Sequence, residues 1–455
     1  MRFNSLCVSD PDGLTFGRAP NPVQCGHGLH IGAGAVYAEV NFTLPPMTLD
    51  ESSRAETLRI YEEAARAVIG RATALQAPGL VIEFEHLPPM TEHPEWGAEI
   101  TRLLTGLLRD AHEATGLPCA LRVTPVDLRH HDHPPQLRSG RPWEALRESF
   151  TLCAEAGADI LSIESVGGKE VSDEALLSGD IEGIALALGV LGARDMAWLW
   201  DQIVSIAQAR SVVAGGDTAC GFGNTAMQLA HQKLLPETLA AVVRAMTAAR
   251  SLVAFERGAV GPSKDCAYEG PVLKAIAGCP ISMEGKSAAC AHFSPVGNIA
   301  AAMCDLWSNE SVQQVQLLSG SAPEAFTEML IYDCRLMNEA LRQGTETALR
   351  DLFVSSDRYG SPQALVLSPQ ATIEIASAIV SEATDYRRTV AAGRAAAALI
   401  RGAVEEGLLR LSKSEARWLE RIETALAGLP AEEGELRERL APAYGGLYAP
   451  VSYGL

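Results

Sequence analysis

The sequence of 455 residues is short of basic side chains: 37 Lys and Arg stand against 56 Asp and Glu, which gives a formal net charge of −19. This deficit argues against an extended nucleic-acid footprint and against attraction to an anionic membrane. The sequence also lacks a basic start followed by an apolar stretch, and its longest apolar run, residues 183–193, is too short to span a bilayer. We therefore expect a cytoplasmic protein that binds neither nucleic acid nor membrane.

A small disulfide framework is lacking as well. The ten cysteines are scattered over a long chain, which suits a reducing compartment in which thiols are core residues or metal ligands. The hydrophobic content of 47% is enough for a large core. Because the length exceeds the roughly 250 residues of a typical barrel, one barrel with an appendage is the simplest expectation.

Short apolar runs alternate with helical patterns along most of the chain, which is typical of an α/β fold with a parallel sheet. Seven runs read as strands: 79–86, 119–125, 159–165, 211–218, 251–258, 280–285 and, less clearly, 314–320. An eighth strand would come from residues 38–42 or from a later, less regular stretch. The pattern predicts a (β/α)8 TIM barrel.

From about residue 346 the strand signals fade, and Ala-, Glu-, Arg- and Leu-rich helical runs take over. We expect residues 1–345 to form the barrel domain with an N-terminal extension, and residues 346–455 to form a helical C-terminal region packed on it.

Glu164, Cys220 and Cys266 each lie at or beyond the end of a strand-like run. In a (β/α) barrel such ends meet at one mouth. Two thiolates and one carboxylate make three protein ligands, which leaves the fourth position of a tetrahedral Zn²⁺ open, as in catalytic sites. Each residue also has an ordinary alternative, since a glutamate at a strand end is commonly solvated and a free cysteine is commonly a small core residue.

Two other clusters are weaker. The histidines and aspartate of residues 130–133 lack the spacing that fixes a metal geometry, and the Gly-rich stretch 25–34 lacks an ordered phosphate-binding motif after a clear strand. We interpret the second stretch as a structured N-terminal loop.

Long blocks of the sequence resemble the zinc-containing catalytic subunit of methanol:corrinoid methyltransferases. They include EFEHLPPMTEHPEWGAE (83–99), SIESVGGKE (162–170), AGGDTACGFGNTAM (214–227), GAVGPSKDCAYEG (258–270) and SMEGKSAACAH (282–292). The resemblance implies a TIM barrel whose zinc is held by Glu164, Cys220 and Cys266. It also implies a corrinoid, or cobalamin, supplied by a separate corrinoid-carrying protein, a small neutral methyl donor such as methanol, and a homodimer or a dimer of heterodimers.

Methanol would occupy the open zinc position, and Co(I) of the partner's corrinoid would attack the methyl carbon. The chain has no D-x-H-x-x-G motif of the kind that contributes a histidine to cobalt, so the corrinoid should arrive on another polypeptide. Asp217, in the loop of Cys220, is a candidate for protonating the departing oxygen, although turn hydrogen bonds explain it equally well. Glu85 and His86, at the end of the first clear strand, are second candidates for lining the pocket.

Val123, Phe84 and Ala219 depart from the family pattern, which has histidine, threonine and aspartate there, at positions expected near the mouth. They leave open a related enzyme that demethylates another small methoxylated compound. Zinc-dependent methyl transfer to a thiol is a second alternative, and a structural zinc protein is a third.

Overall fold

The structure is a computed structural model that describes residues 1–42, 44–45, 47–264, 266–311 and 322–455. Its strands are β1 (Arg18–Cys25), β2 (Leu29–Ala33), β3 (Tyr37–Phe42), β4 (Leu80–Glu85), β5 (Cys119–Thr124), β6 (Ile160–Ile163), β7 (Val213–Asp217), β8 (Ser282–Glu284) and β9 (Leu306–Ser311). β1 and β2 form an antiparallel hairpin. The other seven form a parallel sheet in the order β7-β6-β5-β4-β3-β9-β8.

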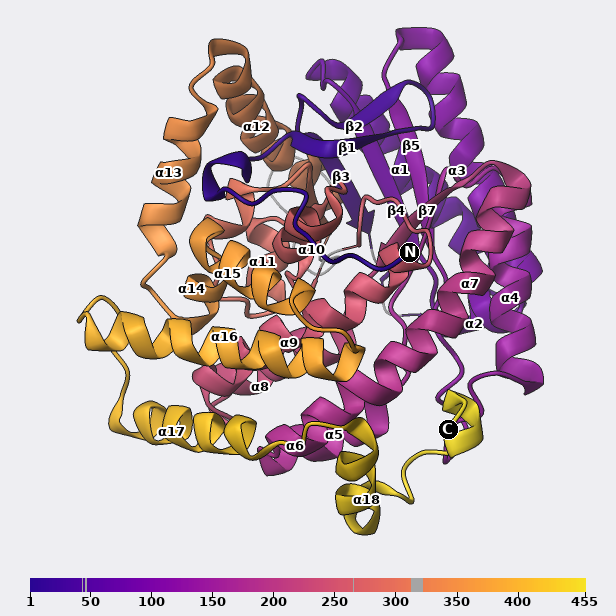
Figure 1. Ribbon diagram of the computed structural model, residues 1–455. Coiled ribbons are helices and arrows are strands. Elements are labelled where there is room, and N and C mark those ends of the chain that lie inside the picture. The colour runs from indigo at the N-terminus through magenta and orange to yellow at the C-terminus, as the bar shows by residue number, and fades with distance from the viewer. Residues whose placement is uncertain (43, 46, 265, 312–321) are drawn as a thin grey trace.

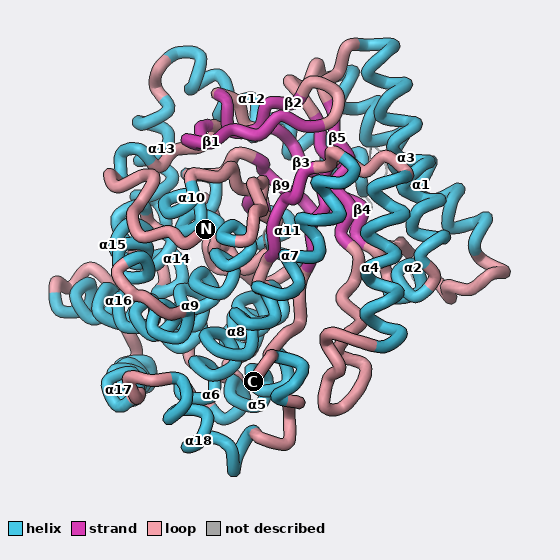
Figure 2. The backbone as a smooth tube through the Cα atoms, turned by 45° about the vertical axis from the view of Figure 1, so that its right-hand side comes forward, coloured by secondary structure: helices cyan, strands magenta, loops and turns pink. Residues whose placement is uncertain are grey.

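Helices surround this sheet (Figure 1), and Figure 2 shows the strands gathered in the middle with the β1–β2 hairpin across one end. The helices are α1 (Arg54–Ala74), α2 (Pro88–Glu92), α3 (Pro94–Thr115), α4 (Gly140–Glu155), α5 (Lys169–Ser178), α6 (Ile181–Leu186), α7 (Ala193–Arg210), α8 (Thr225–His231), α9 (Glu237–Glu256), α10 (Gly270–Ala277), α11 (Lys286–Ala291), α12 (Ala322–Gln343), α13 (Glu346–Asp357), α14 (Pro362–Leu367), α15 (Pro369–Val380), α16 (Asp385–Glu405), α17 (Lys413–Gly428) and α18 (Glu433–Tyr444).

A short extended segment, residues 260–263, joins the two edges of the seven-stranded sheet. On one side, the amides of Val260 and Gly261 donate to the carbonyls of Ala214 and Gly215 in β7, at 2.9 and 2.8 Å. On the other side, Ser263 forms a parallel bridge with Ile281, next to β8. Residues 260–263 therefore take the eighth place in the ring, and the parallel α/β fold expected from the sequence is confirmed.

The eighth place does not come from the predicted strand 251–258. Most of that run is the end of α9, and the ring position is filled by the residues just after it. A helix enclosed on every side is apolar all round, so a short piece of it cannot be distinguished from a buried strand by its pattern. Residues 38–42, one of the two sources expected for an eighth strand, lie in β3. The strand β9 was not predicted. The expected strand 314–320 lies outside the described residues.

Strand alternation determines what fills the ring, because successive side chains point to opposite faces. At the end of the ring where the strands begin, the interior is apolar: Val81, Ala120, Ile160 and Leu306 pack on Cys25, Leu29 and Ile31 of the β1–β2 hairpin. Two residues further along the strands the interior is polar. There Arg122 Nε donates to Glu39 at 2.6 Å, and Arg122 Nη1 donates to Ser162 Oγ at 2.7 Å.

Two residues further again, the alternation brings a set of polar side chains to the mouth of the ring. These side chains are Asn41, Glu85, Glu164, Glu284 and Glu310. The barrel is thus apolar at its closed end and increasingly acidic towards its open end.

The C-terminal region is helical as expected, and α16 packs along α9 (Figure 1). The expected boundary between residues 345 and 346 falls where α12 gives way to α13; its standing as a domain boundary stays a prediction. Two described helical stretches, Ile181–Arg210 and Glu237–Glu256, are long and apolar enough to cross a membrane, which the longest apolar run did not suggest. Their most apolar windows are 83% and 100% buried inside the molecule, so both are explained as core helices.

The Arg122–Glu39 pair gives a prediction about stability. Both side chains are enclosed, with exposures of 0% and 1%, so Arg122→Leu should lower the free energy of unfolding by about 3–5 kcal/mol because Glu39 is left unpaired. The double variant Arg122→Leu/Glu39→Leu should lose less than the sum of the two single variants. Urea unfolding followed by circular dichroism measures both. Arg59→Leu, which breaks an exposed pair with Glu56, is the control; equal losses in Arg59→Leu and Arg122→Leu would contradict the prediction.

Candidate metal centre

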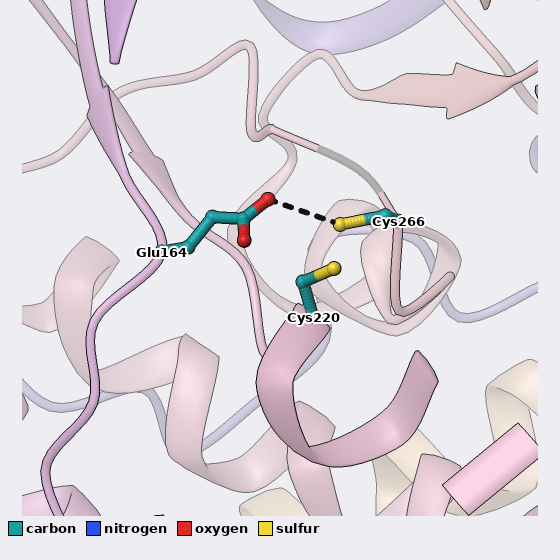
Figure 3. Close-up of side chains that lie close together, drawn as sticks. All are labelled: Glu164, Cys220 and Cys266. Carbon is teal, nitrogen blue, oxygen red and sulfur yellow. Dashed lines mark hydrogen bonds between the residues drawn. The ribbon is translucent and has the colours of Figure 1, made fainter. Parts of the chain in front are cut away.

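Glu164, Cys220 and Cys266 come together at the mouth of the ring. Their ligand atoms all lie within 4.8 Å of one another, and the Cys266 thiol lies 3.3 Å from Glu164 Oε1. Figure 3 shows the carboxylate and both sulfur atoms pointing toward a common centre from three separate segments. The structure therefore assembles the three residues that the sequence singled out as ligands.

Each of the three residues is positioned by a different local backbone structure. Glu164 follows Ser162 by two residues, so it points inward from the end of β6. Cys220 begins a π-helical turn, Cys220–Asn224, that leads into α8. Cys266 follows residues 260–263, which close the ring, so it too reaches the mouth although the strand expected before it is a helix.

Lys264 supplies the positive charge closest to the cluster. Its ammonium lies 2.8 Å from Glu83, 2.9 Å from Glu85 and 3.4 Å from Glu164. Burial alone would lower the pKa of Lys264, but these three carboxylates raise it well above its usual value. Lys264 thus fixes the carboxylate of one ligand and partly neutralises an acidic wall.

A second group of charges lines the same cavity. His292 Nδ1 lies 3.1 Å from Glu284 Oε1, and His292 Nε2 lies 2.9 Å from Glu310 Oε2. Burial disfavours the imidazolium, but the hydrogen bonds to both glutamates outweigh it and raise the pKa of His292 to about 11. His292 is therefore charged at neutral pH and links β8 to β9 across the cavity wall.

The site cavity has a volume of about 260 Å³ and is lined by the three clustered residues and both charged groups. Glu85 lies on it, as expected, and accepts a hydrogen bond from Asn41 at 3.0 Å. Burial raises the pKa of Glu85 to about 7, although Lys264 opposes the rise.

The expectation that His86 lines the pocket is corrected by strand alternation. His86 follows the inward-facing Glu85 and therefore points outward, where its ring lies 3.1 Å from Thr91 Oγ1 and 3.7 Å from Cys153 Sγ. Burial lowers the pKa of His86 to about 3, so the ring is a neutral part of the packing between the sheet and its helices.

Asp217 is not brought to the cavity either, because of a bulge in β7. Leu161 pairs with Ala214 but Ser162 pairs with Gly216, so the inward position falls on Gly216 and Asp217 turns outward. The bulge uses the freedom of glycine: φ of Gly216 is +152°, and a Cβ there would lie 3.2 Å from Ser263 Cα in the closing segment.

The outward-facing Asp217 side chain contacts three groups behind the cavity wall. It accepts hydrogen bonds from Trp200 Nε1 at 3.1 Å and from the amide of Ser165 at 3.3 Å, and Arg250 lies 3.6 Å away. Burial raises the pKa of Asp217, and Arg250 opposes the rise. Since Ser165 directly follows Glu164, Asp217 supports the backbone next to a proposed ligand. Asp217 is not among the residues that line the cavity, which corrects the expectation that it is placed to protonate a departing oxygen.

Sequence reasoning missed Glu83, Lys264, Glu284, His292 and Glu310. A signal for three of them was present: Glu83 precedes Glu85 by two residues, and Glu284 and Glu310 occupy the matching inward positions of β8 and β9. Lys264 and His292 lie in irregular segments, where no periodicity reveals direction.

The donor set fits zinc. Burial raises the pKa of the Cys266 thiol well above its usual value, so a thiolate here needs a bound cation to offset its charge. Two sulfurs and one carboxylate oxygen from three separate segments match the ligand types of zinc and leave one tetrahedral position open.

Comparison with known proteins identifies the family of the chain. A family model described as "Methanol-cobalamin methyltransferase B subunit" matches residues 1–454. The chain belongs to this family. The methanol–corrinoid protein co-methyltransferase of Methanosarcina barkeri (strain Fusaro / DSM 804) is 38% identical over 463 residues, which cover 100% of this chain and 99% of the relative. In the crystal structure of the methanol:cobalamin methyltransferase complex MtaBC from the same organism, one chain matches with a TM-score of 0.95 and 36% identity over the whole of both chains.

The resemblance found in the sequence is thus confirmed, and its three departures are not among the residues that line the cavity. Phe84 and Val123 face outward, with exposures of 1% and 0%, and Phe84 packs on Tyr61. Ala219 is buried, and its amide donates to Glu269 at 2.7 Å.

The ligand assignment predicts the behaviour of two substitutions. Cys220→Ala and Cys266→Ala should each lose zinc while keeping the far-UV circular dichroism of the parent, because the thiols lie at the mouth and not in the packed core. Metal analysis after dialysis gives the zinc content. Cys334→Ala, at a buried cysteine in α12, is the matched control and should keep its zinc; a fully metallated, active Cys220→Ala would refute the assignment.

Asp217→Asn separates positioning from chemistry. The amide keeps the shape of the carboxylate but leaves Arg250 without its charge partner, so we expect a loss of about 1–3 kcal/mol in unfolding free energy with zinc still bound. Urea unfolding and metal analysis of the same sample measure both. If the variant instead has unchanged stability and binds zinc but has lost turnover, Asp217 takes part in the reaction itself.

Proposed function

We propose that the protein transfers the methyl group of methanol to the cobalt of a corrinoid carried by a separate partner protein. The observation that carries this proposal is the Glu164–Cys220–Cys266 cluster, which faces a small cavity at the barrel mouth in a member of the methanol-cobalamin methyltransferase B subunit family. The full-length similarity to an enzyme named for methanol and a corrinoid protein supports both the donor and the acceptor.

The difficulty of the reaction lies in the leaving group. The C–O bond of methanol breaks, Co(I) supplies the electron pair of the new Co–C bond, and the oxygen leaves with the former bonding pair and takes up a proton to give water. Zn²⁺ held by Glu164, Cys220 and Cys266 would supply the Lewis acid that makes this departure possible. A carboxylate in place of a third thiolate donates less electron density and suits the activation of an oxygen.

The residues of the chain have distinct tasks in this proposal. Lys264, at 3.4 Å from Glu164, holds the carboxylate ligand in place. Of the three catalytic candidates from the sequence, Asp217, Glu85 and His86, only Glu85 faces the cavity. We therefore assign to Glu85 the delivery of a proton to the departing oxygen. The cavity of about 260 Å³ suits a small, neutral donor.

The partner would bring its corrinoid to the open end of the ring, because the cluster lies there and the other end is closed by the β1–β2 hairpin. The related structure is of a complex, MtaBC, which supports a separate corrinoid-carrying chain. All ten cysteines are free thiols, which is compatible with a cytoplasmic enzyme.

An anaerobic visible spectrum tests the proposal. Co(I) cobalamin mixed with zinc-loaded protein should convert to methyl-Co(III) when methanol is added, and the conversion should disappear after zinc is removed and return when it is restored. The Cys266→Ala variant is the matched negative control. Conversion with another methyl donor but not with methanol would contradict the proposed substrate, and equal conversion with and without zinc would contradict the role of the metal.

A further inference from the structure

The local helix geometry places Asn224 next to Cys220, one of the proposed ligands. Cys220 and Asn224 are the first and last residues of one π-helical turn, so their side chains lie on the same side of it. Asn224 Nδ2 donates to Cys220 Sγ at 3.6 Å. Such wide turns occur frequently at functional sites, and here the turn brings a neutral donor to a sulfur that would bear charge.

His292 lies on the other side of the Asn224 amide from Cys220 and offers it no acceptor. Both ring nitrogens of the charged His292 are directed to carboxylates, Nδ1 to Glu284 and Nε2 to Glu310. Asn224 Nδ2 lies 3.3 Å from His292 Nδ1, which carries a hydrogen in the imidazolium, so this contact contributes no hydrogen bond. The acceptor within reach of the two Nδ2 hydrogens is the sulfur of Cys220.

The surroundings hold the amide in this place. The Asn224 side chain is only 3% exposed and lines the cavity. Its Oδ1 has no hydrogen-bond partner among the described residues, and its Nδ2 donates to Cys220 Sγ. An acceptor turned toward the thiolate instead would be repelled by it.

We propose that Asn224 is a positioning residue that orients the Cys220 ligand and tempers its donation to the metal through an N–H···S hydrogen bond. This rests on the proposed function, because it requires a thiolate at Cys220. Hydrogen bonds to ligand atoms orient them and tune the metal, and their loss typically costs about 10- to 100-fold in metal affinity or activity. Removing the donor should leave a sulfur that is less well placed and richer in electron density.

Substitution of Co²⁺ for zinc gives a readout that a purely structural role would not move. Thiolate-to-Co(II) charge-transfer bands in the near-ultraviolet report the electron density on the ligand sulfurs. Asn224→Leu, which keeps the size but removes the donor, should shift these bands to longer wavelength and weaken zinc binding about 10-fold in a chelator competition. Gln228→Leu, which removes an amide from the same cavity one helical turn away, is the matched control and should leave the bands in place.

The outcomes separate the inference from the proposed function. Bands present in the parent protein but unmoved in a folded Asn224→Leu would overturn the role of Asn224 while leaving the metal centre intact. If Asn224→Leu fails to fold, Asn224→Asp decides: its carboxylate cannot donate to the sulfur, so unmoved bands overturn the role there too. A parent protein without thiolate bands would instead refute the cysteine ligation on which the proposed function rests.

Discussion

Arg122 and Lys264 lie inside the ring of strands with exposures of 0% and 7%, so their charges have to be matched by carboxylates on neighbouring strands. Glu39 forms an ion pair with Arg122, and Glu83 and Glu85 form ion pairs with Lys264. The second of these pairings lies on the wall of the site cavity, where Lys264 is 3.4 Å from Glu164. A barrel filled only with aliphatic side chains would leave Glu164 with no cation to set its direction.

The same requirement shapes the outer side of the site. Asp217, turned away from the cavity by the bulge in β7, is surrounded by Trp200, Arg250 and the amide of Ser165. His292, also on the cavity lining, is held between Glu284 and Glu310. The proposed metal centre is thus surrounded by groups that already have charge partners, which would keep its three proposed ligands in place before any ion binds and limit the reorganisation that binding requires.

The sequence predicted the features that depend on regular periodicity. Glu164 and Glu85 were singled out because they lie at strand ends, and both line the cavity; the three proposed ligands converge because parallel strands end at one mouth. Asp217 was misplaced because a bulge shifts the alternation by one residue and glycines indicate only that a bulge is permitted. His86 was misplaced because it was grouped with its neighbour Glu85, although adjacent residues face opposite ways. The end of α9 was mistaken for a strand because a fully buried helix lacks a polar face, and Lys264 and His292 were missed because their segments have no period.

X-ray absorption at the zinc edge of the purified, zinc-loaded protein tests the metal centre most directly. The expected spectrum has two sulfur neighbours at about 2.3 Å and lighter oxygen neighbours at about 2.0–2.2 Å, from the carboxylate and an exchangeable ligand. Addition of methanol should change only the lighter shell. A shell of four sulfur or nitrogen ligands from the protein, with no exchangeable position, would show a closed structural site and contradict the catalytic role of Glu164, Cys220 and Cys266.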